Sequence, residues 1–211
     1  MPFVCLPALW IFFLGTALLA FPVVAAAQKD GTPYKQMPAG KYKIDPVHSH
    51  VIFAVEHLGF SIFFGRFNEV YGTLEFDPNE PEKSVLEITL DPTSVDTVND
   101  ELDAELSGSA EFLNAASYPE INFRSQNIVQ TGVRKGQVQG LLTLRGQSRP
   151  LTLNTRLNGA GANPIDERPT LGFSAKGRMR RSEWGMDYLV PQIGDIVALT
   201  INAEFRYQGR P

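Results

Sequence analysis

The chain has 211 residues, of which 43% are hydrophobic, and its 23 acidic and 19 basic side chains leave a net charge of −4. This balance argues against nucleic acid as a partner, because such binding depends on a strong basic excess. The only cysteine, Cys5, lies in the apolar N-terminal segment, so removal of that segment would exclude disulfides, cysteine nucleophiles and zinc–thiolate sites.

The first 27 residues have the pattern of an export signal. Residues 3–27 carry no charged side chain, and an apolar run over residues 9–20 leads through Pro22 to Ala25, Ala26 and Ala27. This order predicts a signal peptide over residues 1–27, cut after Ala27. The run is nearly long enough to span a bilayer, so an uncleaved anchor stays open as an alternative. Either interpretation predicts export, and an exported chain without disulfides suits the periplasm.

Residues 28–40 are rich in Gly, Pro, Lys and Gln and predict a linker. Beyond them, apolar residues recur at every second position, as in Val51, Phe53 and Val55. Such alternation is typical of antiparallel strands with one apolar and one wet face. It predicts strands over residues 41–45, 48–58, 65–77, 84–92, 120–130, 136–146, 149–158, 169–182 and 195–208.

One segment within this series has a different period. Between residues 99 and 116, Leu102, Leu106, Ala110 and Leu113 recur at helical spacing. Asn99 or a neighbouring threonine could cap a helix there, and acidic residues occupy its first turn. The pattern therefore predicts one short helical insert, which could serve as a lid or merely bury apolar side chains at one end of the sheet.

A long antiparallel series must roll up, because an open apolar face and open edges are both costly. We therefore predict an all-β fold, an antiparallel barrel over residues 41–208 that forms one domain. Alternation alone does not decide whether the interior is a filled core or a container.

The sequence offers no conventional catalytic or metal-binding constellation. His48 and His50 fall on one strand face and His57 on the other, which argues against a three-histidine metal site. His57 is in phase with Phe53 and Val55, so it is either a hydrogen-bonded core residue or a polar contact for a ligand inside the barrel. We predict no metal and no catalytic cofactor.

Four groups of residues, in this order, resemble the YceI-like family of exported, lipocalin-like lipid-binding proteins. The first is Asp45-Pro46-Val47-His48-Ser49 with Phe53, His57 and Gly65-Arg66-Phe67; the second is Phe112-Leu113-Asn114 with Tyr118-Pro119 and Ile121-Asn122-Phe123. The third is the run from Gly140 to Gly146, and the last is the run from Arg181 to Met186 with Gly194-Asp195-Ile196-Val197. The set covers residues 41–207. Small departures are Leu113 and Trp184, where the family often has phenylalanine, and Gln147-Ser148 in place of Val-Thr.

The resemblance implies a lipocalin-like barrel of about eight strands with an elongated apolar pocket. It further implies that the pocket holds a polyisoprenoid lipid, such as a prenyl phosphate or an isoprenoid quinone. A chain of dozens of carbons can bind through hydrophobic contact alone, because each buried CH₂ group contributes about 0.8 kcal/mol. As ligand-binding residues we predict Phe53, Val55, His57, Phe112, Leu113, Phe123, Leu142, Phe173 and Trp184; the alternative is that these residues are ordinary core.

The leading hypothesis is a non-catalytic periplasmic carrier or store for an isoprenoid lipid. A lipid carrier implies a membrane donor or acceptor, and an edge strand could pair two subunits into a homodimer. One alternative is a filled barrel that acts as an interaction module, which interior volume would distinguish. Another is an isoprenoid- or quinone-modifying enzyme, which would require His57 and Asp195 to converge on the pocket.

Overall fold

The computed structural model describes residues 34–209. The predicted signal peptide, its cut after Ala27 and residues 28–33 of the predicted linker lie outside the described residues. Eleven strands are present: β1 (Gly40–Ile44), β2 (His50–His57), β3 (Ser61–Phe67), β4 (Val70–Phe76), β5 (Val85–Leu90), β6 (Val95–Asp96), β7 (Ile121–Gly132), β8 (Lys135–Leu144), β9 (Gln147–Ala162), β10 (Pro169–Arg180) and β11 (Ile193–Tyr207). Four short 3-10 helices, η1 (Tyr34–Gln36), η2 (Pro81–Lys83), η3 (Pro92–Ser94) and η4 (Arg181–Trp184), and one α-helix, α1 (Asp100–Gly108), complete the described elements.

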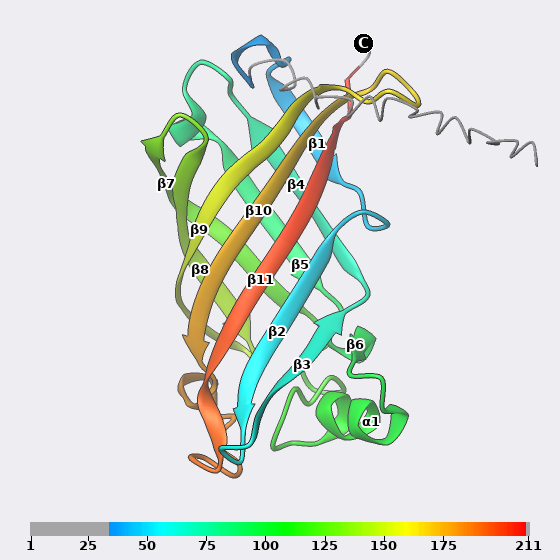
Figure 1. Ribbon diagram of the computed structural model, residues 1–211, viewed down its shortest axis with the longest axis vertical. Helices are drawn as coiled ribbons and strands as arrows, with labels where there is room; N and C mark the ends of the chain where they lie inside the picture. Colours follow the sequence, from blue (N-terminus) through cyan, green and yellow to red (C-terminus); the bar gives the residue numbers. More distant parts are fainter. Residues whose placement is uncertain (1–33, 210–211) are drawn as a thin grey trace, which may run out of the picture.

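The strands form a closed antiparallel barrel, as predicted (Figure 1). Closure depends on β11, which pairs with β2 between Ile193 and Asn202 and with β1 between Phe205 and Tyr207. β1 and β2 are therefore two halves of one bent strand, and β3 and β4 form a second bent strand that pairs with them. Counted in this way, the barrel wall has eight strands.

The predicted strand over residues 65–77 is two strands in the structure. β3 already begins at Ser61, and the chain leaves the ladder at Asn68 and Glu69. There the backbone amide of Asn68 donates to the Ser94 carbonyl and that of Glu69 to the Ser94 hydroxyl, each at 3.0 Å. These bonds to η3 take the place of ladder bonds at the bend. The same region adds β6, a two-residue strand that the pattern did not predict.

Helix α1 begins where the sequence predicts but ends earlier. The Asn99 side chain caps it by accepting from the amides of Glu101 and Leu102. The helix ends at Gly108 rather than near residue 116, because Ser109 is extended and the following turn folds back. In that turn the Leu113 amide donates to the Leu106 carbonyl at 3.0 Å, which explains the helical spacing of the two leucines. No described helix has the length and apolar character needed to cross a membrane.

Alternate residues of every long strand point into the barrel and form one hydrophobic core. At the end that carries α1, Trp184 of η4 is 1% exposed and its indole N–H donates to the Leu142 carbonyl at 3.2 Å. At the opposite end, Tyr42 is fully buried, and Met37, just before β1, is also buried against the barrel. Both ends of the barrel are thus covered, and the space between them holds the candidate site.

Candidate functional site

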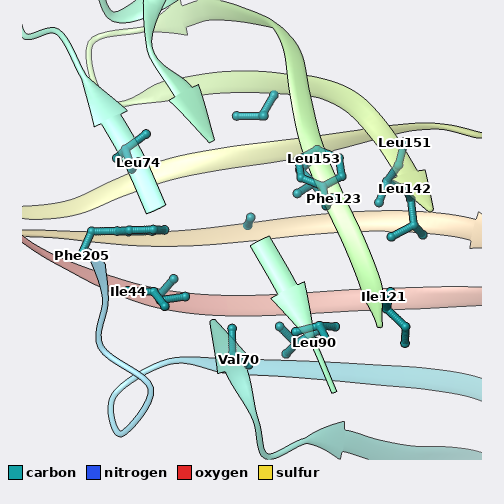
Figure 2. Packing of buried hydrophobic residues seen from close by; sticks show 14 of the residues in the cluster. Ile44, Val70, Leu74, Leu90, Ile121, Phe123, Leu142, Leu151, Leu153 and Phe205 are labelled. Carbon is teal, nitrogen blue, oxygen red and sulfur yellow. The ribbon is translucent and has the colours of Figure 1, made fainter. Parts of the chain in front are cut away.

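The barrel is hollow between its two covered ends. A cavity of about 210 Å³ lies inside it. Its wall includes Ile44 from β1, Leu74 from β4, Ile88 from β5, Phe123 from β7, Leu142 from β8, Leu153 from β9, Ala175 from β10 and Ala203 from β11. Figure 2 shows Ile44, Leu74, Phe123, Leu142 and Leu153 within this cluster of interior side chains. The cavity is therefore lined by apolar side chains from all around the barrel.

The cavity wall is almost free of polar groups. Its polar residues are Ser49, His50, Ser84, Thr155 and Asn202, and no Lys, Arg, Asp or Glu is among the described residues that line it. An apolar wall of this kind favours hydrocarbon over water, because water needs two to four polar partners to be held. The cavity can bind an apolar chain, and the described residues that line it include no acid–base pair.

Three of the nine predicted ligand residues, Phe123, Leu142 and Phe173, line this cavity. The Phe123 ring lies against the wall over Gly140, where a Cβ atom would be only 2.7 Å from the ring's Cζ. A glycine on the neighbouring strand thus lets the aromatic ring lie against the barrel wall. Phe173 packs edge to face against Phe205, with ring centroids 6.1 Å apart.

Phe53, Val55 and His57 lie on β2 but do not line the cavity. The Phe53 ring covers Gly65 on β3 and lies 5.9 Å from the Phe67 ring. Val55 and His57 are half-buried farther toward the end that carries α1. These three residues share a strand face, as the alternation predicts, but none of them is part of the cavity wall.

Phe112, Leu113 and Trp184 lie at the end of the barrel that carries α1. Phe112 is half-buried and packs edge to face against Tyr188, with centroids 5.8 Å apart. Leu113 and Trp184 are buried. None of the three lines the cavity, so the structure places them in the cover of this barrel end.

Most of the aliphatic wall of the cavity was not among the predicted ligand residues, many of which are aromatic. Val138, Leu151, Leu153, Leu199 and Ile201 all line the cavity. The alternation of apolar residues in the sequence does place each of them on the inner face of its strand. That signal does not distinguish a cavity wall from a filled core, since both require inward apolar side chains.

A second, smaller cavity lies next to the first, toward the end opposite α1. It measures about 100 Å³ and shares Phe76, Pro81, Ile128, Thr155 and Phe173 with the main cavity. The remaining wall comes from Tyr34, Leu157, residues 129–130 and residues 132–136 of β7, β8 and their turn. We call this smaller cavity the mouth.

One cluster of a histidine and two carboxylates lies outside the cavity. Ligand atoms of Asp45, His48 and Glu204 all lie within 4.8 Å of one another. The Arg206 guanidinium is 3.6 Å from the Asp45 carboxylate, and His48 Nδ1 is 3.1 Å from the same carboxylate. Burial raises the pKa of Asp45, but the hydrogen bonds from His48 and the Val47 amide, with the charges of His48 and Arg206, outweigh it and lower the pKa. The group is therefore an ion-pair network, with a cation already present at its carboxylate.

His57 and Asp195, the pair that an enzyme would use, do not converge on the cavity. Neither residue lines it. Asp195 accepts a hydrogen bond from the Ser182 amide at 2.9 Å and pairs with Arg180 at 3.4 Å. Burial raises the pKa of Asp195, but these contacts outweigh it and keep the pKa below its usual value. Asp195 thus holds the segment between β10 and β11.

Comparisons with known proteins place this architecture in a family. A family model described as a YceI-like domain matches residues 42–205. Protein YceI of Escherichia coli O6:H1 is 35% identical over 168 residues, which cover 79% of this chain and 86% of that protein. Among solved structures, BcnA of Burkholderia cenocepacia has a TM-score of 0.69 at 21% identity, over 76% of this chain and 98% of BcnA. A polyisoprenoid binding domain from Saccharophagus degradans, implicated in plant cell wall breakdown, has a TM-score of 0.55 at 13% identity, over 78% of this chain and 97% of that domain.

Proposed function

The chain belongs to the YceI-like family, and from this premise we propose that it binds an isoprenoid lipid in the barrel cavity, for transport or storage and without catalysis. The observation that carries the proposal is the apolar cavity of about 210 Å³ inside the barrel. A filled barrel that acted only through its surface would have no such space. The polyisoprenoid binding domain from Saccharophagus degradans, which has the same fold, supports an isoprenoid as the ligand class.

The chemistry of the cavity fits a long hydrocarbon. Each buried CH₂ group contributes about 0.8 kcal/mol, and a long apolar tail can therefore exceed the cost of association, which is on the order of 4–15 kcal/mol. The scarcity of polar groups in the wall means that the tail is recognised by shape and by exclusion from water. A prenyl phosphate and an isoprenoid quinone both satisfy this requirement.

We propose the periplasm as the compartment of this binding. The support is the uncharged N-terminal segment over residues 3–27 and the alanines at 25–27. A carrier in that compartment would exchange its lipid with a membrane donor or acceptor. Recovery of the protein in a periplasmic extract, with an N-terminus at Gln28, would support this proposal, whereas retention of residues 1–27 would favour the membrane anchor.

Filling the cavity tests the proposed function directly. Ala203 lines the cavity on β11, whereas Ala198 lies on the opposite face of the same strand. In Ala203→Phe, the new ring occupies the space of the lipid tail, and we expect at least ~10-fold weaker lipid binding, which corresponds to about 1.4 kcal/mol. Ala198→Phe adds the same ring outside the barrel and is expected to bind as the wild type does.

The measurement is native mass spectrometry of the purified protein, with organic extraction of the bound lipid and with titration of an isoprenoid into the delipidated protein. A wild-type protein that neither carries nor takes up any isoprenoid would contradict the proposed function. Equal binding by Ala203→Phe and Ala198→Phe would place the lipid outside this cavity.

A further inference from the structure

Two loops without Asp, Glu, Lys or Arg lie together at the end of the barrel that carries α1 (Figure 1). One is the hairpin between β2 and β3, residues 57–65, and the other leads into β11, residues 188–194. The Leu58 amide donates to the Gln192 carbonyl at 2.9 Å, and His57 pairs with Ile193 in the ladder. We call these two stretches together the tip.

The tip exposes large apolar side chains. Phe60 is 89% exposed, Phe64 61% and Ile62 54%. Ile62 and Phe64 alternate along β3 and therefore share its outer face. Leu58 and Leu189 are exposed as well. A group of exposed apolar residues of this kind marks a contact surface in a soluble domain.

The turns of the tip satisfy their own backbone groups. The Phe60 amide donates to the His57 carbonyl at 3.0 Å, and the Ile193 amide donates to the Leu189 carbonyl at 2.7 Å. A backbone group without a partner is costly in an apolar medium. Because these bonds are internal, the side chains of the tip can enter the boundary between lipid head groups and acyl chains with the turns intact.

A row of basic side chains on β10 runs toward the tip. Lys176, Arg178 and Arg180 alternate along β10 and are exposed on its outer face, and we call them the basic stripe. Arg180 pairs with Asp195 at 3.4 Å, whereas no carboxylate in the described part of the chain pairs with Lys176 or Arg178. The residues that face the stripe on β11 are uncharged: Thr200, Ala198 and Ile196. The stripe therefore presents positive charge beside an apolar surface.

Helix α1 places acidic groups on the other side of the tip. The strands follow the order β10, β11, β2, β3 and β6, and α1 packs against β6. The first turn of α1 carries Asp100, Glu101 and Asp103. Between the stripe and β3, the exposed Glu56 on β2 opposes the two unpaired cations, while Asp187 offsets the buried charge of Arg181. A negatively charged surface would thus attract the β10 side of the tip and repel the α1 side.

We propose that the protein docks through the tip on the surface of a bilayer that contains anionic phospholipid. The apolar side chains of the tip enter the head-group boundary, and the basic stripe lies against the lipid phosphates. The tip offers few hydrogen-bonding side chains to a protein partner, whose interface would need about one hydrogen bond per 100–200 Å². The inference goes beyond the proposed function, because docking does not depend on what the cavity holds.

Co-sedimentation with two kinds of isoprenoid-free vesicle tests the inference. One kind is phosphatidylcholine alone, and the other is equal parts of phosphatidylcholine and phosphatidylglycerol. We expect the wild type to bind both, and to bind the vesicles with phosphatidylglycerol more tightly at low salt. That preference should shrink at high salt, because salt screens exposed charges. All variants are compared with the same N-terminus, so that any contribution of residues 1–33 is common to them.

One pair of variants tests the apolar contact. Phe60→Ser removes a ring that is 89% exposed, and we expect ~10-fold weaker binding to both kinds of vesicle. Ile165→Ser is the matched control, because Ile165 is 92% exposed in the loop between β9 and β10, away from the tip. It is expected to bind as the wild type does.

A second pair tests the basic stripe. Arg178→Gln should weaken binding about five-fold with the phosphatidylglycerol vesicles and leave binding to phosphatidylcholine unchanged. Lys135→Gln is the matched control, because Lys135 is exposed at the mouth, at the other end of the barrel. It is expected to keep the wild-type preference for phosphatidylglycerol.

A wild-type protein that binds neither kind of vesicle would overturn the proposal, as would equal binding by Phe60→Ser and Ile165→Ser. Equal binding of Arg178→Gln and Lys135→Gln to the phosphatidylglycerol vesicles would show that the stripe does not face the membrane, and the proposed orientation would be wrong. These outcomes leave the proposed function intact, because the vesicles contain no isoprenoid.

Sedimentation velocity without vesicles tests the other occupant of the tip, a second copy of this chain. We expect Phe60→Ser to have the same oligomeric state as the wild type. If Phe60→Ser converted a wild-type dimer into a monomer and left vesicle binding unchanged, the tip would be an interface between two copies, and the docking proposal would be wrong.

Discussion

Asp45 is the residue at which one long strand bends into two, β1 and β2. One of its carboxylate oxygens accepts from the Val47 amide and the other lies beside His48, each at 3.1 Å. The bend lets β11 pair with β1 along one part of its length and with β2 along another. The polar network of Asp45, His48 and Arg206 therefore supports barrel closure from outside the cavity.

The pH dependence of stability tests this role of Asp45. The hydrogen bond and charge of Asp45 raise the pKa of His48 above its usual 6.5. A raised pKa means that protonated His48 stabilises the folded state below pH 6.5, and that this contribution is lost as pH rises through the folded-state pKa. We expect His48→Gln to lower the melting temperature more at about pH 5.5 than at about pH 8.5.

The control for this comparison is His50→Gln, because His50 forms no ion pair with a carboxylate among the described residues. Its effect on the melting temperature is expected to be the same at both pH values. Thermal unfolding followed by circular dichroism gives the measurement. An equal loss for His48→Gln at the two pH values would show that its charge does not support the bend.

Among the elements, the segment between β10 and β11 depends on one buried arginine. Arg181 is 6% exposed, and its guanidinium donates to the carbonyls of Gly194, Met186, Tyr188 and Ile193 at 2.8–2.9 Å. Burial lowers its pKa, yet an arginine stays charged. A single side chain thereby fixes η4 and the loop that covers this barrel end.

Removal of Arg181 should therefore destabilise the whole barrel. Arg181→Ala leaves four carbonyls without their donor, and we expect a loss of roughly 3 kcal/mol in the free energy of unfolding. Arg178→Ala, an exposed position on the same strand end, is expected to change it by less than about 0.5 kcal/mol. Urea unfolding of both variants gives the measurement. If Arg181→Ala unfolded at the wild-type urea midpoint, Arg181 would not stabilise η4 and the loop that follows it.

The whole molecule is a barrel covered at both ends around a partly empty interior. The side chains around such an interior lack some of the dispersion contacts that a filled core would have. A ligand that binds only the folded state restores contacts and shifts the unfolding equilibrium. The stability of the protein should consequently depend on the lipid that it carries.

Thermal unfolding with added lipid tests this dependence. At a free ligand concentration one hundred times the Kd, we expect about 2.7 kcal/mol of added stability. The melting temperature should rise with the concentration of added isoprenoid in the wild type and rise less in Ala203→Phe at the same concentration. A wild-type melting temperature that does not change with saturating lipid would contradict binding to the folded state.

The sequence by itself determined most of the strands, the one short α-helix and the rolled antiparallel sheet. Period-two alternation has one physical solution when the strands are many and their edges must be paired. It also assigned Phe123, Leu142 and Phe173 to the inner face of their strands, where they line the cavity. The capping of α1 by Asn99 followed from local chemistry in the same way.

Only the tertiary structure decided which inward residues surround a space. Alternation specifies the face on which a side chain lies, but not its height along the barrel or whether neighbours fill the volume in front of it. For this reason Phe53 and His57, in the inward phase, lie away from the cavity. The smaller cavity likewise brings Tyr34 beside Gln130, although the two residues are distant in sequence.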